Sequence, residues 1–342
     1  MSFCDPPDVI HSSSCTLPRS LSLSLSLSLS LSFFLFIFQV TRMACSMGDY
    51  ITLNVYYPAN ATAADELPVV IFLHPYAYHA GFVPTYYKKD PTGPDIDYIY
   101  GHLAARGAMV LVYDQVGFGI RTVDAAAFYQ RFPASSKLAR MVQEVSQAVD
   151  FAYCRSGRGR ADVNCMDDEA HTGTYPNYLP TLPQADMARV AVVGYSLGAL
   201  VGLHAAALDP RITAVALASP PTPWRTDADD RPTGGRRRLC EWHALMPKLC
   251  LFSSATAAAI PYDVGDLLAA LAPRPTLVYA PQHDRDATFA DVQHAAAQAQ
   301  PAWAHHGAAP NFTLATPPRA NSFNNVDIGA VADWLAAIGF LH

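Results

Sequence analysis

Residues 189–208 constrain the fold of this chain more than any other segment. Residues 190–193 are an apolar, mostly β-branched run, which is typical of a strand buried on both faces. Residues 194–198 follow and match the pattern G-x-S-x-G, with Ser196 at its centre. Residues 197–208 are mostly alanine and leucine, as expected of a buried helix. The sequence therefore predicts a strand, a sharp turn and a helix in that order.

This order of elements gives Ser196 the features of a nucleophile. The two glycines of the pattern allow the strand and the helix to pass close to a serine held in strained backbone. The N-terminus of the helix offers unpaired N–H groups and a positive potential to a developing oxyanion. The alternative is an ordinary turn with an incidental serine, but the agreement between pattern and context favours a nucleophile.

From about Asp49 to the C-terminus the chain resembles the α/β-hydrolase superfamily. It is most similar to the branch of dienelactone hydrolases, acetyl-xylan esterases and prolyl-oligopeptidase catalytic domains. The resemblance implies an α/β fold with a mostly parallel sheet, helices on both faces and catalytic residues at the carboxyl ends of the strands. It also implies a serine hydrolase that acts on carboxylic esters or a related acyl substrate without a cofactor. We expect this domain to span residues 49–342.

The segment after the apolar run at residues 69–73 is expected to complete an oxyanion hole. In the family, the matching strand ends in His-Gly, followed by a residue whose backbone N–H binds the oxyanion. Here the order is His74, Pro75, Tyr76, so the resemblance assigns the two oxyanion donors to Leu197 and Tyr76. His74 is expected to support this loop.

The triad acid is expected in the polar loop that follows the apolar run at residues 276–280. The resemblance assigns the acid to Asp284, with Asp286 as the second choice. The alternative is a polar loop with two solvated carboxylates. The order of serine before aspartate agrees with the superfamily.

The triad histidine is absent from its expected place. It should lie between the last strand, at residues 311–315, and the last helix, at residues 327–338. Asn321 stands there, and an asparagine cannot take the proton of Ser196 at neutral pH. We expect His243 to serve as a substitute base, chosen from the loop histidines at the same edge of the sheet: His74, His79, His243 and His283. The empty position also favours a second hypothesis, a non-catalytic binding protein with this fold.

Residues 219–262 show no strand pattern and lie before the strand that carries the acid. The resemblance implies a lid insertion here, whose apolar residues either cover an acyl pocket or pack the lid onto the domain. The basic run at residues 236–238 is expected to be a solvated loop. The chain has seven cysteines, and although Cys240 and Cys250 are close enough to pair, free thiols are favoured.

Residues 1–46 are expected to lie outside the fold. Residues 21–32 are a strict Leu-Ser alternation, which has three alternative origins. In the first, the alternation is a nucleotide repeat read as coding sequence, and translation starts at Met43 or Met47 in a cytoplasmic protein. In the second, it is part of a signal peptide. In the third, residues 21–40 are a membrane anchor.

The net charge of −6 argues against a nucleic-acid partner, and a small-molecule ester is the expected one. A metalloenzyme is a third hypothesis. It is disfavoured because the histidines lack the spacing of an H-E-x-x-H site.

Overall fold

The structure is a computed structural model that describes residues 36–44, 50–82, 98–156, 182–228 and 235–342. All of these residues belong to one unit, Phe34–His342.

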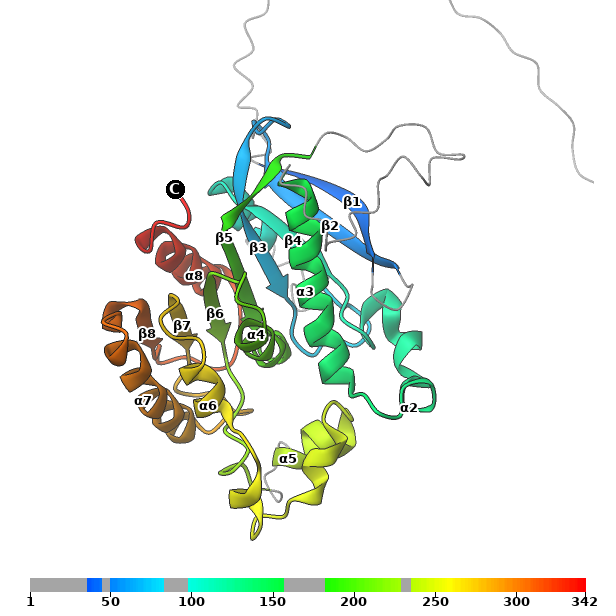
Figure 1. Cartoon of the computed structure of the whole chain (residues 1–342), viewed down its shortest axis with the longest axis vertical. Helices are drawn as coiled ribbons and strands as arrows, with labels where there is room; N and C mark the ends of the chain where they lie inside the picture. Colours follow the sequence, from blue (N-terminus) through cyan, green and yellow to red (C-terminus); the bar gives the residue numbers. More distant parts are fainter. Residues whose placement is uncertain (1–35, 45–49, 83–97, 157–181, 229–234) are drawn as a thin grey trace, which may run out of the picture. The chain divides into compact units, whose positions relative to one another are not determined.

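Within the described residues the strands form one eight-stranded sheet, in the order β1-β2-β4-β3-β5-β6-β7-β8. Strands β3 to β8 run parallel to one another, whereas β1 pairs antiparallel with β2, and β2 pairs antiparallel with β4, at one edge. Figure 1 shows this arrangement. The strands are β1 Phe36–Ala44, β2 Tyr50–Pro58, β3 Glu66–Leu73, β4 Met109–Tyr113, β5 Gln184–Tyr195, β6 Ala214–Ala218, β7 Thr276–Tyr279 and β8 Phe312–Ala315. The predicted mostly parallel sheet is therefore confirmed.

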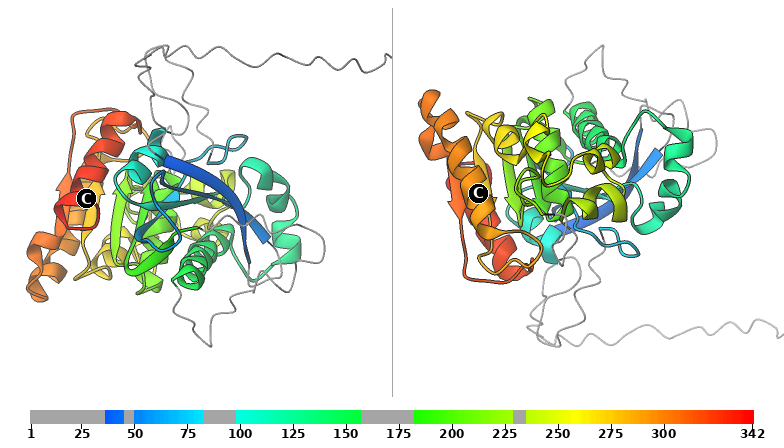
Figure 2. Two further views of the ribbon diagram at one scale, coloured as in Figure 1. Left: turned by 90° about the horizontal axis from the view of Figure 1, so that it is seen from above. Right: turned by 90° about the horizontal axis from the view of Figure 1, so that it is seen from below.

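The helices cover both faces of the sheet. Those of eight residues or more are α1 Tyr98–Ala105, α3 Lys137–Arg155, α4 Leu197–Leu208, α7 Phe289–His305 and α8 Asn325–Ala337. The shorter ones are α2 Phe128–Arg131, α5 Gly235–Arg237, α6 Val264–Ala269, the 3₁₀ helices η1 Gly119–Ala125, η3 Pro247–Leu251, η4 Ala257–Ala259 and η5 Ala309–Asn311, and the π-helical turn η2 Arg238–Trp242. Residues of α3, α4, α6 and α7 share one apolar core, and those of α1 and α8 share another. Both views in Figure 2 place α3 and α4 across the sheet from α1.

The apolar runs read from the sequence form the centre of the sheet because both of its faces are covered. Every residue of β4 and β6 is buried, and Val69 to Leu73 of β3 are buried as well. Alternate residues of β3 point to opposite faces, so Ile71 packs in one core and Phe72 in the other. Parallel strands end at the same edge, and the loops that follow β3, β5, β7 and β8 meet there.

The N-terminal boundary differs from the expectation. We expected residues 1–46 to lie outside the fold, but β1 pairs with β2 along its whole length, and Met43 is 1% exposed opposite Ile51. Strand β1 satisfies the backbone groups of β2, which would otherwise form the open edge of the sheet. The unit therefore begins near Phe34. The Leu-Ser repeat lies outside the described residues, and in the part of the chain that is described no helix has the length and hydropathy of a membrane span.

Residues 219–262 connect β6 to β7 with short helical turns. In their described part, which omits residues 229–234, no strand occurs. Cys240 and Cys250 form a disulfide that joins η2 to η3, which corrects the expectation of free thiols at this pair. The basic run also differs from the expected solvated loop, since Arg237 is exposed but Arg236 is 1% exposed.

Candidate active site

Ser196 lies in the turn between β5 and α4. Its backbone has φ 54° and ψ −107°, a conformation that a residue with a side chain adopts at a cost of about 1–3 kcal/mol. The backbone N–H of Ser196 donates to the carbonyl oxygen of Ala218 at 2.9 Å, which ties the turn to the end of β6. The strand, turn and helix predicted from the sequence are all present.

The two glycines of the pattern are required by close backbone contacts. A Cβ atom at Gly194 would lie 2.2 Å from the carbonyl oxygen of Gly198, across the turn itself. A Cβ atom at Gly198 would lie 2.0 Å from the carbonyl oxygen of Leu73, at the end of β3. Both obstacles are backbone atoms that cannot rotate away. Only glycine therefore allows β5, α4 and β3 to meet around Ser196.

His74 supports the loop that follows β3. It is 1% exposed, and its Nε2 accepts a hydrogen bond from the backbone N–H of Gln115 at 3.1 Å. Its Nδ1 therefore carries the hydrogen and donates to the carbonyl oxygen of Pro75 at 2.7 Å. Burial lowers the pKa of His74 to about 4, so the ring is neutral at pH 7. One ring nitrogen is thus bonded within the loop that leads to Tyr76, and the other ties this loop to the segment after β4.

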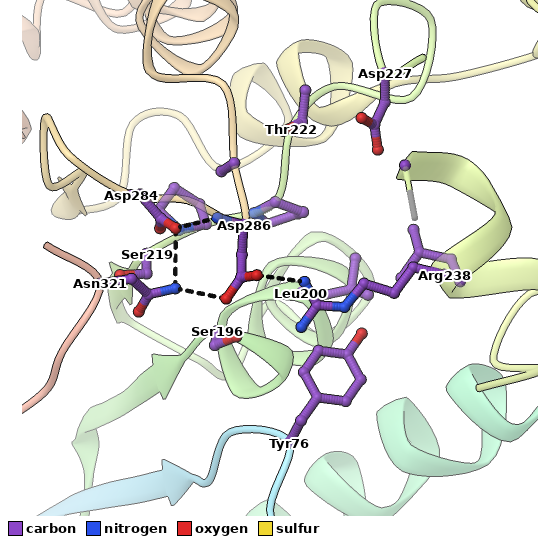
Figure 3. A pocket seen from close by; sticks show the side chains of 15 residues that line it. Tyr76, Ser196, Leu200, Ser219, Thr222, Asp227, Arg238, Asp284, Asp286 and Asn321 are labelled. Carbon is purple, nitrogen blue, oxygen red and sulfur yellow. Dashed lines mark hydrogen bonds and ion pairs between the residues drawn. The ribbon is translucent and has the colours of Figure 1, made fainter. Parts of the chain in front are cut away.

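Asn321 contacts the candidate acids at the position where the sequence lacks a histidine. Its Nδ2 donates to Asp284 Oδ1 at 3.0 Å and, more weakly, to Asp286 Oδ2 at 3.4 Å. Its Oδ1 accepts a hydrogen bond from the Tyr195 hydroxyl at 2.8 Å. Figure 3 shows the amide nitrogen between the two carboxylates. The three bonds fix the amide orientation, and no nitrogen in this group can accept a proton at neutral pH.

The two carboxylates differ in their surroundings. Burial raises the pKa of Asp284, although hydrogen bonds from the backbone of Asp286 and the side chain of Asn321 oppose the shift. The N–H of Asp286 reaches Asp284 Oδ1 at 2.7 Å. The carboxylate of Asp286 instead pairs with Arg238, whose Nη1 lies 3.1 Å from Asp286 Oδ1. Asp284 is thus held by Asn321 from the loop after β8, and Asp286 by an arginine from the segment between β6 and β7.

His243 lies against the aromatic side chains of the β3 loop. Its ring stacks on Tyr76 with 4.5 Å between centroids, and its Nδ1 is hydrogen-bonded to the hydroxyl of Tyr78. Burial, together with the positive charges of Arg238 and Lys137, lowers the pKa of His243 to about 4. Among the described residues His243 is not part of the wall of either cavity that contains Ser196. The structure therefore does not bring His243 and Ser196 together.

Ser196 opens into two cavities of different size. The smaller, of about 50 Å³, brings together Ser196, Tyr76, Asp284, Asp286 and Asn321. The larger, of about 730 Å³, has aromatic walls and includes Phe72, Phe82, Tyr100 and Phe323. The side chain of Leu197 is fully buried, and its N–H belongs to the first turn of α4, where no intrahelical acceptor exists.

Two residues at these cavities were not selected from the sequence. Arg238 lines both cavities, although its basic run gave no sign of a role other than solvation. His283 is exposed and lines the larger cavity together with Ser196. His74 is the other loop histidine in the wall of that cavity. In the part of the chain that is described, no cluster of three or more histidine, cysteine or acidic side chains could hold a metal ion.

No family model matches the sequence, and no curated protein matches it. Solved structures do match the fold. A family 15 glucuronoyl esterase from Teredinibacter turnerae aligns with a TM-score of 0.61 and 14% identity over 89% of this chain and 74% of that one. A family 15 glucuronoyl esterase from Caldicellulosiruptor kristjansonii aligns with a TM-score of 0.58 and 18% identity over 88% of this chain and 81% of that one.

A methylesterase also matches, with a TM-score of 0.58 and 19% identity over 90% of this chain. The present chain spans 56% of the length of that protein. At these identities the likeness concerns the fold alone, and the three neighbours named here are esterases.

Proposed function

We propose that this chain, which has the α/β-hydrolase fold, is a serine hydrolase that acts on small-molecule carboxylic esters. The observation that carries the proposal is the backbone of Ser196, held at φ 54° and ψ −107° where two cavities meet. Strain of this kind persists only where the surrounding structure enforces it, and it is concentrated at active sites. The structural neighbours include glucuronoyl esterases and a methylesterase, which supports an ester as the substrate.

In the proposed reaction the Oγ atom of Ser196 attacks the ester carbonyl. The backbone N–H groups of Leu197 and Tyr76 donate to the oxyanion, since one begins α4 and the other follows β3 beside Ser196. Residues 219–262 act as a lid, because Arg238 and Leu239 of this segment line the smaller cavity.

The proposed base is His243, oriented by Asp284. Because its pKa is about 4, the imidazole is neutral at pH 7 and has a lone pair available for a proton. To reach Ser196 the ring has to leave Tyr76 and Tyr78. The proposal therefore requires a movement of the lid segment during the reaction.

A second candidate function is a non-catalytic binding protein. The observation that favours it is the Asn321 side chain, whose donor and acceptor atoms are already bonded to Asp284 and Tyr195. A base approaching Asp284 would have to displace this amide. In that case the two cavities hold a ligand that Ser196 does not attack.

A serine-directed phosphonate probe distinguishes the two functions. It reacts with a serine that a neighbouring base activates, so no substrate has to be known. We expect the wild type to be labelled at Ser196, Ser196→Ala and His243→Ala to remain unlabelled, and the control His283→Ala to be labelled like the wild type. A folded wild type that resists the probe would favour the binding protein, and labelling of His243→Ala would assign the base elsewhere.

A further inference from the structure

The two cavities at Ser196 share part of their walls. Five residues line both the smaller and the larger cavity: Tyr76, Ser196, Arg238, Asp286 and Asn321. Residues that line both cavities lie between them, so these side chains form a partition. In Figure 3 Arg238 reaches across this partition to Asp286, near Ser196 and Tyr76.

Arg238 is held in the partition by two different contacts. Its Nη1 lies 3.1 Å from Asp286 Oδ1, and its guanidinium carbon lies 4.8 Å from the centre of the Tyr76 ring. A planar guanidinium is suited to pairing with a carboxylate while it stacks on an aromatic ring. The side chains of Arg238 and Asp286 are 21% and 25% exposed, which limits screening of the pair by solvent. The guanidinium group is therefore held both by the Asp286 carboxylate and by the Tyr76 ring.

The volumes on the two sides limit what each can accept. A cavity needs about 10–15 Å³ to hold one water molecule. By this measure the smaller cavity, at about 50 Å³, holds about four non-hydrogen atoms. The larger, at about 730 Å³, accepts a bulky group, and its walls of Phe72, Tyr100 and Phe323 favour an apolar or aromatic one.

The order of bond changes in ester hydrolysis decides which group occupies which side. Ser196 Oγ bonds to the acyl carbon, the bond to the alkoxy oxygen breaks, and the serine proton leaves with the alcohol. Water then adds to the acyl carbon and returns a proton to Ser196 Oγ, which releases the acid. Because water attacks from the position that the alcohol vacated, the leaving side has to admit water while the acyl group stays bound. Both cavities can hold a water molecule, but the larger has far more room for one, so we assign the leaving side to the larger cavity.

We propose that Arg238 sets substrate specificity by dividing the site into two unequal parts. The smaller part accepts an acyl group of about two to four carbon atoms, and the larger part accepts a bulky alcohol. This inference rests on the proposed function of Ser196 as a nucleophile and goes beyond it by naming the substrate class.

The test compares kcat/KM for the p-nitrophenyl esters of acetate, butanoate and octanoate. For the wild type we expect acetate and butanoate to exceed octanoate by about tenfold or more, because a filled pocket rejects added methylenes by such factors. Arg238→Ala joins the two cavities and should raise the octanoate-to-acetate ratio about tenfold. The matched control is Arg237→Ala, an exposed neighbour paired with Glu241 at 2.7 Å, which should leave the ratio unchanged.

A second variant keeps the test decisive if Arg238→Ala does not fold. Ala287 lines the smaller cavity alone, and Ala287→Val should reduce butanoate hydrolysis more than acetate hydrolysis. Equal rates for all three esters in the wild type, or an unchanged ratio in folded Arg238→Ala, would overturn the partition while Ser196 remains a nucleophile. Absence of any hydrolysis above that of Ser196→Ala would overturn the proposed function and this inference together.

Discussion

The turn around Ser196 and the loop around Asn321 line the same cavities but are stabilised in opposite ways. The turn keeps a serine at φ 54°, and two glycines in backbone contact with their neighbours maintain it. The loop is instead held by the side chain of Asn321, whose donor and acceptor atoms are bonded to Asp284 and Tyr195. The turn holds a strained backbone, whereas the loop provides a hydrogen bond that offsets the cost of burying the charge of Asp284.

This difference has a consequence for activity. Strain at a serine contributes nothing to stability and is retained where the chemistry uses it. An asparagine that satisfies a half-buried carboxylate does contribute to stability, but it occupies the position where we expected the histidine that would serve the serine. The site therefore combines a region organised for reaction with one organised for stability. Three changes test this contrast, from the largest expected effect to the smallest.

The first change removes the backbone fit of the turn. In Gly198→Ala the new Cβ would lie 2.0 Å from the carbonyl oxygen of Leu73, so β3 and α4 have to separate. We expect the free energy of unfolding to fall by about 3 kcal/mol or more, since overpacking against rigid atoms is costly. Chemical denaturation followed by circular dichroism measures the loss.

Gly329→Ala is the matched control for this change. Gly329 lies in α8, and a Cβ atom there would have nothing within 4 Å. Because alanine favours a helix over glycine, we expect a gain of about 0.5–1 kcal/mol. Equal effects of the two variants would contradict the claim that the turn depends on close backbone contact.

The second change replaces the amide of Asn321, which stabilises the loop, by an imidazole that can act as a base. Asn321→His places an imidazole beside Asp284 and should raise ester turnover about a hundredfold or more, the usual contribution of a general base. Hydrolysis of p-nitrophenyl acetate measures the gain. In this background Asp284→Asn should remove most of it by favouring the wrong tautomer, whereas Asp286→Asn should remove little. An inactive, folded Asn321→His would mean that the position does not serve Ser196.

The third change is acidification, to which His74 in the loop after β3 and Asp284 beside Asn321 respond with opposite signs. The pKa of His74 is about 4, below its ordinary value of 6.5, so its contribution to stability is present above pH 6.5 and is lost toward pH 4. For this buried ring the loss is on the order of 3 kcal/mol. The pKa of Asp284 is raised, so its burial cost is relieved as the pH falls through that value.

Denaturation curves between pH 7 and pH 4 measure this response. The slope of stability against pH should flatten in His74→Gln and steepen in Asp284→Asn, whatever the absolute stability of each variant. A steeper slope in His74→Gln would show that the histidine is not held neutral.

The turn around Ser196 was predictable because all of its parts are adjacent in the sequence. A strand, G-x-S-x-G and a helix are contiguous, so the strained serine follows from neighbours in the chain. The parallel topology likewise predicted that the loops carrying Asp284 and Asn321 would meet, because parallel strands end at one edge. The topology did not predict whether Asn321 contacts Asp284 or Asp286. In the structure its Nδ2 donates to both carboxylates.

Features that depend on packing between distant segments were not predictable. Strand β1 follows a low-complexity repeat, and its place is set by the open edge of β2. The stacking of His243 on Tyr76 and the pairing of Arg238 with Asp286 arise from how residues 219–262 fold over the sheet edge. That segment has neither a strand pattern nor a long helix from which its path could be read.

Detection of an acyl-enzyme tests the central claim most directly. After a short incubation with p-nitrophenyl acetate and an acid quench, peptide mass spectrometry locates any acetyl group on the chain. We predict acetylation at Ser196 in the wild type, more of it in Asn321→His, and none at that peptide in Ser196→Ala. A folded wild type with no acetyl group on Ser196 would contradict it, and the network around Asn321 would then mark a binding site.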